Sequence, residues 1–372
     1  MTLDVLLVTV GVLGLVIAAL SEKVRRMPMS EPLLALLAGV LLGDAVLGVL
    51  PIPSLTTDHT TLHIGAELLL AVSVMAVALR YPLRDVRRRL GPVTLLLVVA
   101  MPVMAVVSTG LGWLVLGVPL ATAALLGAAM AATDPVLASS ILTGDVAEAD
   151  IPARDREVLS LESGANDGLA LPLVLVALAM ASPMTGAAAV GESLWQVLGA
   201  VVVGAALGWL GGRALRLGEE HGATAHAPAL FYTIVLALAI LGVAGLLRTD
   251  AILAVFVGGL AFNHVSTGAD RTAEVSIDEA VNRFAVLPLF VVLGAALPWQ
   301  AWADLGWRGP ALAAAILLLR RLPVLFLLAR PLRLRWHEAA YLGWFGPIGV
   351  TTLFYLTLEA ERIHVPEVVL AA

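Results

Sequence analysis

Residues 157–181 read EVLSLESGANDGLALPLVLVALAMA, a stretch long enough to cross a bilayer that carries polar groups in its first half. A membrane-spanning helix needs about 20 mostly apolar residues, and an ionisable group deep in such a helix costs several kcal/mol. Four polar side chains nevertheless cluster here: Glu162, Ser163, Asn166 and Asp167. The stretch therefore predicts a membrane helix with a functional polar site.

The spacing divides these four residues between two helix faces. Ser163 and Asp167 are one turn apart, and so are Glu162 and Asn166. Glu162 and Asp167 are separated by about 140° around the helix, too far for one tight pair of carboxylates. One face can offer a carboxylate and a hydroxyl to a cation, while the other can hold Glu162 against a basic partner.

The whole chain has the composition of a membrane protein. Of its 372 residues, 60% are hydrophobic and only 13% are charged. A soluble domain has about 25% charged residues, so this composition excludes a soluble globule, a disordered chain, a collagen and a coiled coil. Cysteine is absent, which excludes disulfides and thiolate metal sites.

Apolar segments of membrane length recur along the chain. Twelve spans are predicted, at residues 4–20, 32–50, 61–79, 92–117, 119–142, 157–181, 191–212, 229–247, 250–266, 279–297, 309–329 and 338–358. A thirteenth begins at Pro366 and reaches only Ala372, so we expect it to be truncated. The fold class is an all-α polytopic membrane protein.

The basic residues predict the orientation of the spans. Lys and Arg favour cytoplasmic loops. Seventeen of the 22 lie in alternate loops, at Lys23, Arg25, Arg26, Arg80, Arg84, Arg87, Arg88, Arg89, Arg154, Arg156, Arg213, Arg216, Arg271, Arg283, Arg330, Arg333 and Arg335. This places the N-terminus outside, and a completed thirteenth helix would place the C-terminus in the cytoplasm.

Two further spans contain helix-breaking residues near their middles. Asp134 directly precedes Pro135, and proline disfavours helix in the residue before it, so a break is predicted at Thr133–Asp134. A second break is predicted at Gly346, Pro347 and Gly349. Broken helices are tolerated inside a membrane where they are buried or line a cavity, and their ends bind ions.

These features fall at one depth. At 1.5 Å per residue, Asp134, Asp167 and the second break lie about 12–15 Å from the cytoplasmic ends of their spans. Arg320, beside Arg321 in another span, lies about 17 Å from the outer end. Both arginines need counter-charges, for which Glu162 and Asp134 are at comparable depth. The two breaks lie in spans of opposite orientation, which predicts an inverted repeat and a transporter site at the midplane.

The motifs Ala132-Thr-Asp-Pro135 and Glu162-Ser-Gly-Ala-Asn-Asp-Gly168, with Asp250-Ala-Ile-Leu-Ala-Val-Phe-Val-Gly-Gly-Leu260, resemble the NhaP/NHE-type monovalent cation:proton antiporter family. The resemblance implies one domain over 1–372 with two crossed broken helices. Its core subdomain would be residues 92–181 and 309–372, and its dimerisation or scaffold subdomain residues 1–80 and 191–297. It also implies a homodimer in the cell membrane.

The resemblance further implies the residue roles. Asp167 would bind Na⁺, Li⁺, K⁺ or a proton, and Ser163, Thr133, Asp134 and Asn166 would complete the site. Glu162 and Arg320 would form a buried ion pair. Asn166, where electrogenic relatives have a second aspartate, implies an electroneutral exchange. Glu67, in the third span, lies about two turns before the position where some relatives carry an acid.

The sequence leaves alternatives to exchange by alternating access. A cation channel could use the same acids, but the paired breaks and the lack of a filter-like carbonyl repeat favour a transporter. A transport-inactive regulatory relative is the other alternative. An enzyme is disfavoured because residues 336–341 lack the second histidine of a zinc helix and no phosphate loop or nucleophile elbow occurs. No cofactor and no nucleic-acid partner are expected.

Overall fold

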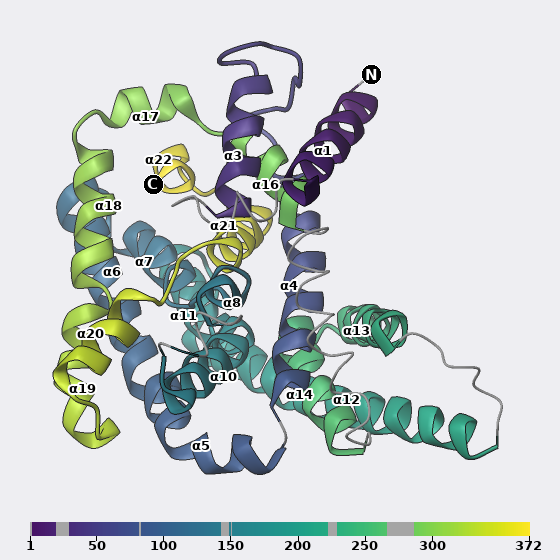
Figure 1. Ribbon diagram of the computed structural model, residues 1–372. Coiled ribbons are helices and arrows are strands. Elements are labelled where there is room, and N and C mark those ends of the chain that lie inside the picture. Colours follow the sequence, from purple (N-terminus) through teal and green to yellow (C-terminus); the bar gives the residue numbers. More distant parts are fainter. Residues whose placement is uncertain are drawn as a thin grey trace.

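The computed structural model describes residues 2–19, 30–81, 83–142, 149, 151–221, 229–265 and 286–372, and the regular elements in these ranges are all helices (Figure 1). The first half of the chain contains α1 (Thr2–Ala19), α3 (Glu31–Leu42), α4 (Thr60–Arg80), α5 (Leu83–Leu95), the π-helical turn Leu96–Ala100, α6 (Met101–Leu116), α7 (Leu120–Ala129), α8 (Pro135–Leu142), α10 (Ala153–Leu169) and α11 (Leu171–Ala181). The second half contains α12 (Gly186–Glu220), α13 (Ala229–Leu246), α14 (Ala251–Val265), α16 (Val286–Ala295), α17 (Trp299–Leu305), α18 (Arg308–Leu319), α19 (Leu322–Leu332), α20 (Trp336–Trp344), α21 (Val350–Arg362) and α22 (Glu367–Ala371).

Five helical stretches in the described part of the chain are long and apolar enough to cross a membrane: Thr60–Arg80, Leu83–Leu116, Ala153–Ala181, Gly186–Gly218 and Arg308–Leu332. A sixth results if α16 and α17, which meet at a bend of 59°, count as one span. Shorter apolar helices, among them α7 and α14, account for several other predicted spans. The all-α membrane fold is confirmed, whereas the count of twelve spans stays a prediction.

The predicted ends of the second and seventh spans differ from the ends of the helices in the structure. The span expected at 32–50 ends as a helix at Leu42, where the N–H of Gly43 donates to the carbonyl of Gly39 at 2.8 Å. Gly48 then turns the chain with a φ of +62°, a conformation that favours glycine. The seventh span was expected to end at residue 212, but α12 continues to Glu220. Apolar content alone does not locate such ends.

The basic stretch after α4 was expected to be a loop, but it is the first part of a helix that runs without interruption to Leu116. Val86 is buried on one side of α5, while Arg88 pairs with Asp85 at 3.6 Å on the other. Arg89 pairs with Glu157 of α10 at 2.6 Å. Arg88 and Arg89 are thus paired with acids on helices. The predicted loop residues Lys23, Arg25, Arg26, Arg271 and Arg283 lie outside the described residues.

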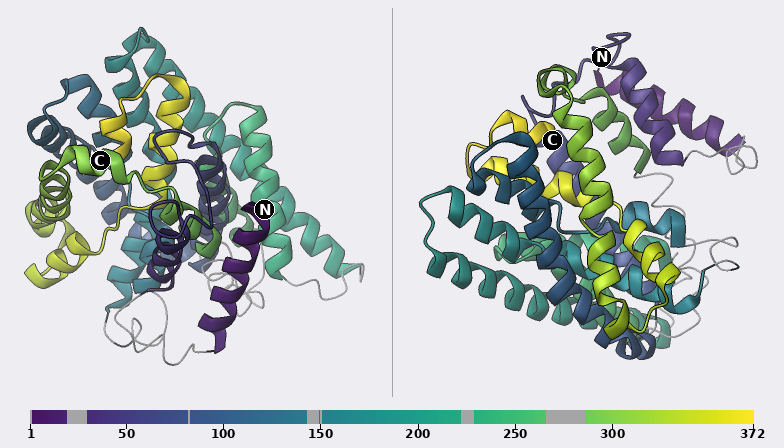
Figure 2. Two further views of the ribbon diagram at one scale, coloured as in Figure 1. Left: turned by 90° about the horizontal axis from the view of Figure 1, so that it is seen from above. Right: turned by 90° about the vertical axis from the view of Figure 1, so that its left-hand side faces the viewer.

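Both predicted helix breaks are present, and they meet. The first separates α7 from α8, which begins at Pro135. The second separates α20 from α21. The N–H of Asp134 donates to the carbonyl of Pro347 at 3.0 Å, so the two breaks touch. In Figure 1, α7, α8, α10 and α21 gather at the centre, with α18–α20 to one side and α12–α14 to the other. Figure 2 shows the molecule from two further directions, with the C-terminal helices in yellow. Of these, α21 packs against α4 and α7.

Glycines let several helices pack backbone to backbone. A Cβ added at Gly204 or Gly208 of α12 would lie 2.2 or 2.0 Å from a carbonyl oxygen of α14. The same holds for Gly39 of α3 against α16, at 2.1 Å. Helix association in a membrane depends on such close packing of small residues, because lipid supplies no hydrophobic driving force between helices. These contacts hold α12 on α14 and α3 on α16.

The substitution Gly208→Ala should destabilise the protein by about 1–3 kcal/mol, because the new methyl group collides with the backbone of Gly258 and forces the helices apart. Thermal unfolding in detergent measures the change. Gly242→Ala in α13 is the matched control, since a Cβ there meets nothing within 4 Å. Equal unfolding temperatures for the two variants would contradict the packing argument.

Candidate functional site

The buried guanidinium of Arg320 joins the two broken helices. Its Nη1 donates to the carbonyls of Met130 and Ala132 at 2.6 and 3.2 Å, and its Nη2 donates to the carbonyl of Gly346 at 2.6 Å. Helix breaks leave carbonyls without their usual partners, and such groups must be satisfied inside the protein at membrane depth. Arg320 does this for both breaks at once, with only 3% of its surface exposed.

The neighbouring arginine makes the buried ion pair. Arg321 donates to both carboxylate oxygens of Glu162, at 2.9 and 2.8 Å, in a bidentate arrangement. Its Nε also donates to the carbonyl of Leu342 at 2.9 Å. The predicted pairing of Glu162 with Arg320 is therefore wrong in its partner. The helix is interrupted between α18 and α19 at these two residues. The side chains of Arg320 and Arg321 therefore reach different partners.

Asn166 connects this ion pair to the first break. Its Nδ2 donates to the Thr133 hydroxyl at 2.7 Å and to a Glu162 carboxylate oxygen at 3.1 Å. Its Oδ1 accepts the N–H of Thr133 at 3.2 Å. Asn166 is fully buried, so these bonds also satisfy an otherwise costly amide. The predicted site residues Asn166 and Thr133 are thus brought together.

Asp167 lies on the other side of α10 and has a different environment. Its Oδ1 accepts the hydroxyl of Thr351 at 2.7 Å. Its Oδ2 has no hydrogen-bond partner in the described part of the chain, although only 1% of the residue is exposed. Glu162 and Asp167 therefore have separate partners, as their spacing predicts. Asp167 is a buried carboxylate with an oxygen left for a ligand.

Two further predicted residues, Asp134 and Ser163, make separate contacts. Asp134 accepts the N–H of Val350 at the start of α21, so one carboxylate oxygen caps the half-helix after the second break. Its charge lies close enough to interact with that of Asp167. Ser163 donates to the carbonyl of Ser160 in its own helix at 3.0 Å. Ser163 thus bonds within α10.

Sequence reasoning missed two residues of α21. Thr351 donates to the Asp167 carboxylate, and the hydroxyl of Tyr355 donates to the Asp167 carbonyl. The signal for them is their spacing: they are four residues apart, hence on one helix face, and follow directly after the break at Gly349. Together they fix the position of Asp167 against α21.

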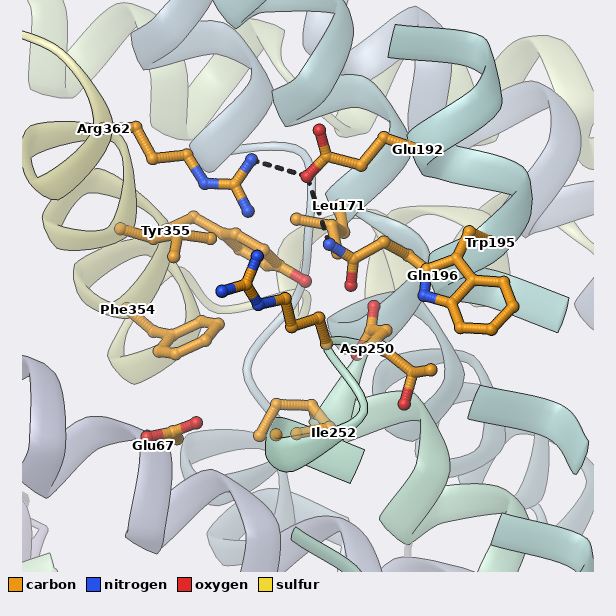
Figure 3. A pocket seen from close by; sticks show the side chains of 15 residues that line it. Glu67, Leu171, Glu192, Trp195, Gln196, Asp250, Ile252, Phe354, Tyr355 and Arg362 are labelled. Atoms are coloured by element: carbon orange, nitrogen blue, oxygen red, sulfur yellow. Dashed lines mark hydrogen bonds and ion pairs between the residues drawn. The ribbon is translucent and has the colours of Figure 1, made fainter. Parts of the chain in front are cut away.

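An open cavity of about 620 Å³ lies beside this site (Figure 3). Its lining includes Glu67 of α4, Glu192 of α12, Asp250 before α14, and Tyr355 and Arg362 of α21. Arg362 and Glu192 form an ion pair at 2.8 Å across it. Because Tyr355 both lines the cavity and donates to the backbone carbonyl of Asp167, one side chain separates the cavity from the backbone of Asp167.

Comparison with known proteins agrees with this geometry. A family model described as sodium/hydrogen exchanger, transmembrane, matches residues 12–371. The chain is 32% identical over 380 residues to the Na(+)/H(+) antiporter 2 of Zygosaccharomyces rouxii, covering 95% of this chain and 46% of that protein. It is 28% identical to a Na(+)/H(+) antiporter of Saccharomyces cerevisiae, covering 95% of this chain and 38% of that protein. The chain thus spans less than half the length of these relatives.

A solved structure has the same fold. The sodium proton antiporter MjNhaP1 from Methanocaldococcus jannaschii at pH 8 superposes with a TM-score of 0.75. The match covers 100% of this chain and 93% of that protein, at 19% sequence identity. At this identity the likeness concerns the fold.

Glu162→Gln or Arg321→Gln should each lower the stability by about 3–5 kcal/mol, because each leaves one buried charge without its partner. Combining the two substitutions should cost less than the sum of the single effects, since no lone charge then remains. Thermal unfolding of the four proteins in detergent gives the coupling energy.

Arg88→Gln serves as the control, because its pair with Asp85 is largely exposed and should contribute at most about 1 kcal/mol. Additive effects of Glu162→Gln and Arg321→Gln would show that the two side chains do not act as a pair.

Proposed function

Because the chain belongs to the sodium/hydrogen exchanger family, we propose that it exchanges a monovalent cation, Na⁺ or K⁺, for a proton across a membrane. The observation that carries the proposal is the state of Asp167. Its carboxylate is buried at the crossing of two broken helices and receives one hydroxyl, and its other oxygen has no hydrogen-bond partner among the described residues. Carboxylate oxygens suit both a hard cation and a proton.

The chemistry follows from the cost of burying charge. An ionised carboxylate in a low-dielectric interior is unfavourable unless something neutralises it. A cation or a proton can each neutralise Asp167, but they compete for the same oxygens. The loaded site can then move between the two faces, while the empty and charged site is opposed by its desolvation cost. Competition for one carboxylate therefore couples cation movement to proton movement in the opposite direction.

Electroneutral exchange is supported by the partners of the other acids. Glu162 is neutralised by Arg321, and Asp134 accepts a backbone N–H at the start of α21. Asn166 contributes no charge at the position next to Asp167. Among the acids at the crossing of the broken helices, Asp167 is thus the carboxylate left to exchange one cation for one proton.

Alternating access is supported by how the site and cavity divide between helices. Thr133, Asp134, Asp167 and Thr351 all belong to the expected core, residues 92–181 and 309–372. The cavity wall opposite them comes from α4, α12 and the start of α14, in the expected scaffold, residues 1–80 and 191–297. A movement of the core relative to the scaffold would open and close the route to Asp167.

The proposal includes the setting of the protein. The chain would lie in the cell membrane as a homodimer, with its N-terminus outside. The orientation is supported by the uneven distribution of Lys and Arg along the sequence. The dimer is supported by the family resemblance of the motifs.

Asp167→Asn should abolish cation:proton exchange while the protein still folds and inserts. The neutral amide has no charge to attract a cation and does not take up a proton. Proteoliposomes with an imposed pH gradient, challenged with Na⁺, Li⁺ or K⁺, measure the exchange. Asp304→Asn, the same substitution at an exposed residue of α17, should leave exchange unchanged. Exchange that survives Asp167→Asn would rule out this carboxylate as the binding group.

A further inference from the structure

Asp250, like Asp167, is a buried carboxylate, but the proposed exchange mechanism does not use it. It directly precedes α14, and its Oδ1 accepts the N–H of Leu253 at 2.9 Å, which caps the start of that helix. Its Oδ2 has no hydrogen-bond partner in the described ranges, although only 5% of the residue is exposed. Capping accounts for one of its oxygens and leaves the other unexplained.

The free oxygen belongs to a residue that lines the cavity beside Asp167. In Figure 3 the side chains of Asp250, Gln196 and Tyr355 point into the same part of that space. Of the other two acids in the lining, Glu192 is already paired with Arg362 at 2.8 Å and accepts the Gln196 amide at 3.3 Å, whereas Glu67 of α4 is only half-buried. Arg248, an exposed residue, also lines the cavity. Asp250 is thus the buried acid of this cavity that keeps an oxygen for a ligand.

Asp250 is also close to the exchange site. Tyr355 lines the cavity with Asp250 and donates its hydroxyl to the carbonyl of Asp167. The charges of Asp250 and Asp167 are near enough to interact. A cation at Asp250 would therefore sit one tyrosine side chain away from the Asp167 region, and would reduce the repulsion between the two acids.

We propose that the free Oδ2 of Asp250, with the hydroxyl oxygen of Tyr355, forms an outer capture site for a monovalent cation on its way to Asp167. This proposal rests on the proposed exchange function. A partly hydrated cation enters from the cavity, exchanges some of its water for the carboxylate oxygen, and moves on when Asp167 becomes free. A negative charge at the end of a low-dielectric cavity concentrates cations and speeds their entry.

Asp250→Asn is the decisive substitution, because asparagine caps a helix about as well as aspartate and has nearly the same size. In the proposed orientation the ninth predicted span, residues 250–266, begins on the outer face, so the KM for Na⁺ added on that face should rise about tenfold, at the lower end of what field focusing gives to entry rates. The KM on the inner face and kcat should change little. Right-side-out and inside-out membrane vesicles separate the two faces.

Asp58→Asn is the matched control. Asp58 likewise accepts a backbone N–H at a helix start, from Thr60 at 3.0 Å, but it is exposed and does not line the cavity. The outer KM should not change in this variant. An unchanged outer KM in Asp250→Asn, or an equal loss at both faces, would show that Asp250 is only a helix cap.

A binding measurement tests the capture site without relying on exchange. Purified Asp167→Asn protein should keep a weak site for radiolabelled Na⁺ that is lost on adding Asp250→Asn and retained on adding Asp58→Asn. Absence of that weak site in Asp167→Asn protein would overturn the proposal. If the unmodified protein fails to exchange cations for protons, the proposed function falls, and this binding result still decides the capture site.

Discussion

The two helix breaks depend on Arg320. A membrane interior offers no water to the carbonyls that a broken helix exposes, so each must find a partner within the protein. Arg320 donates to Met130 and Ala132 at one break and to Gly346 at the other. Asp134 completes the junction through its backbone N–H on Pro347 and its carboxylate on the N–H of Val350. The breaks can therefore exist at this depth because they satisfy one another through these two residues.

The placement of charge at the crossing then leaves one group available for exchange. Glu162 is held by Arg321 and by the Asn166 amide, which ties α10 to the first break. The Asp134 carboxylate accepts the N–H of Val350 at the start of α21. Within the part of the chain that the structure describes, Asp167, on the opposite face of α10 from Glu162, receives only the hydroxyl of Thr351 at one oxygen. A site for a mobile ion needs such an incompletely satisfied group, because a fully satisfied carboxylate would have nothing to gain from a ligand.

Local chemistry explains which parts of this arrangement are predictable from sequence. Proline disfavours helix in the residue before it, and the Gly346–Gly349 stretch combines proline with glycine, so both interruptions could be located in advance. The separation of Glu162 from Asp167 follows from helical geometry alone. The choice between Arg320 and Arg321 could not be made, because the interruption between α18 and α19 sets the direction of each side chain. The contacts of Thr351, Tyr355 and Asp250 depend on tertiary packing and on a cavity formed by five separate regions of the chain.

The central claim is that one buried carboxylate holds either a cation or a proton. It is tested most directly by measuring, on the unmodified purified protein in weak buffer, the protons released for each Na⁺ bound as pH is lowered. The account predicts a value that approaches one and does not exceed it, with apparent Na⁺ affinity falling as proton concentration rises. Binding of Na⁺ at low pH without proton release, or release of two protons for each Na⁺, would contradict it.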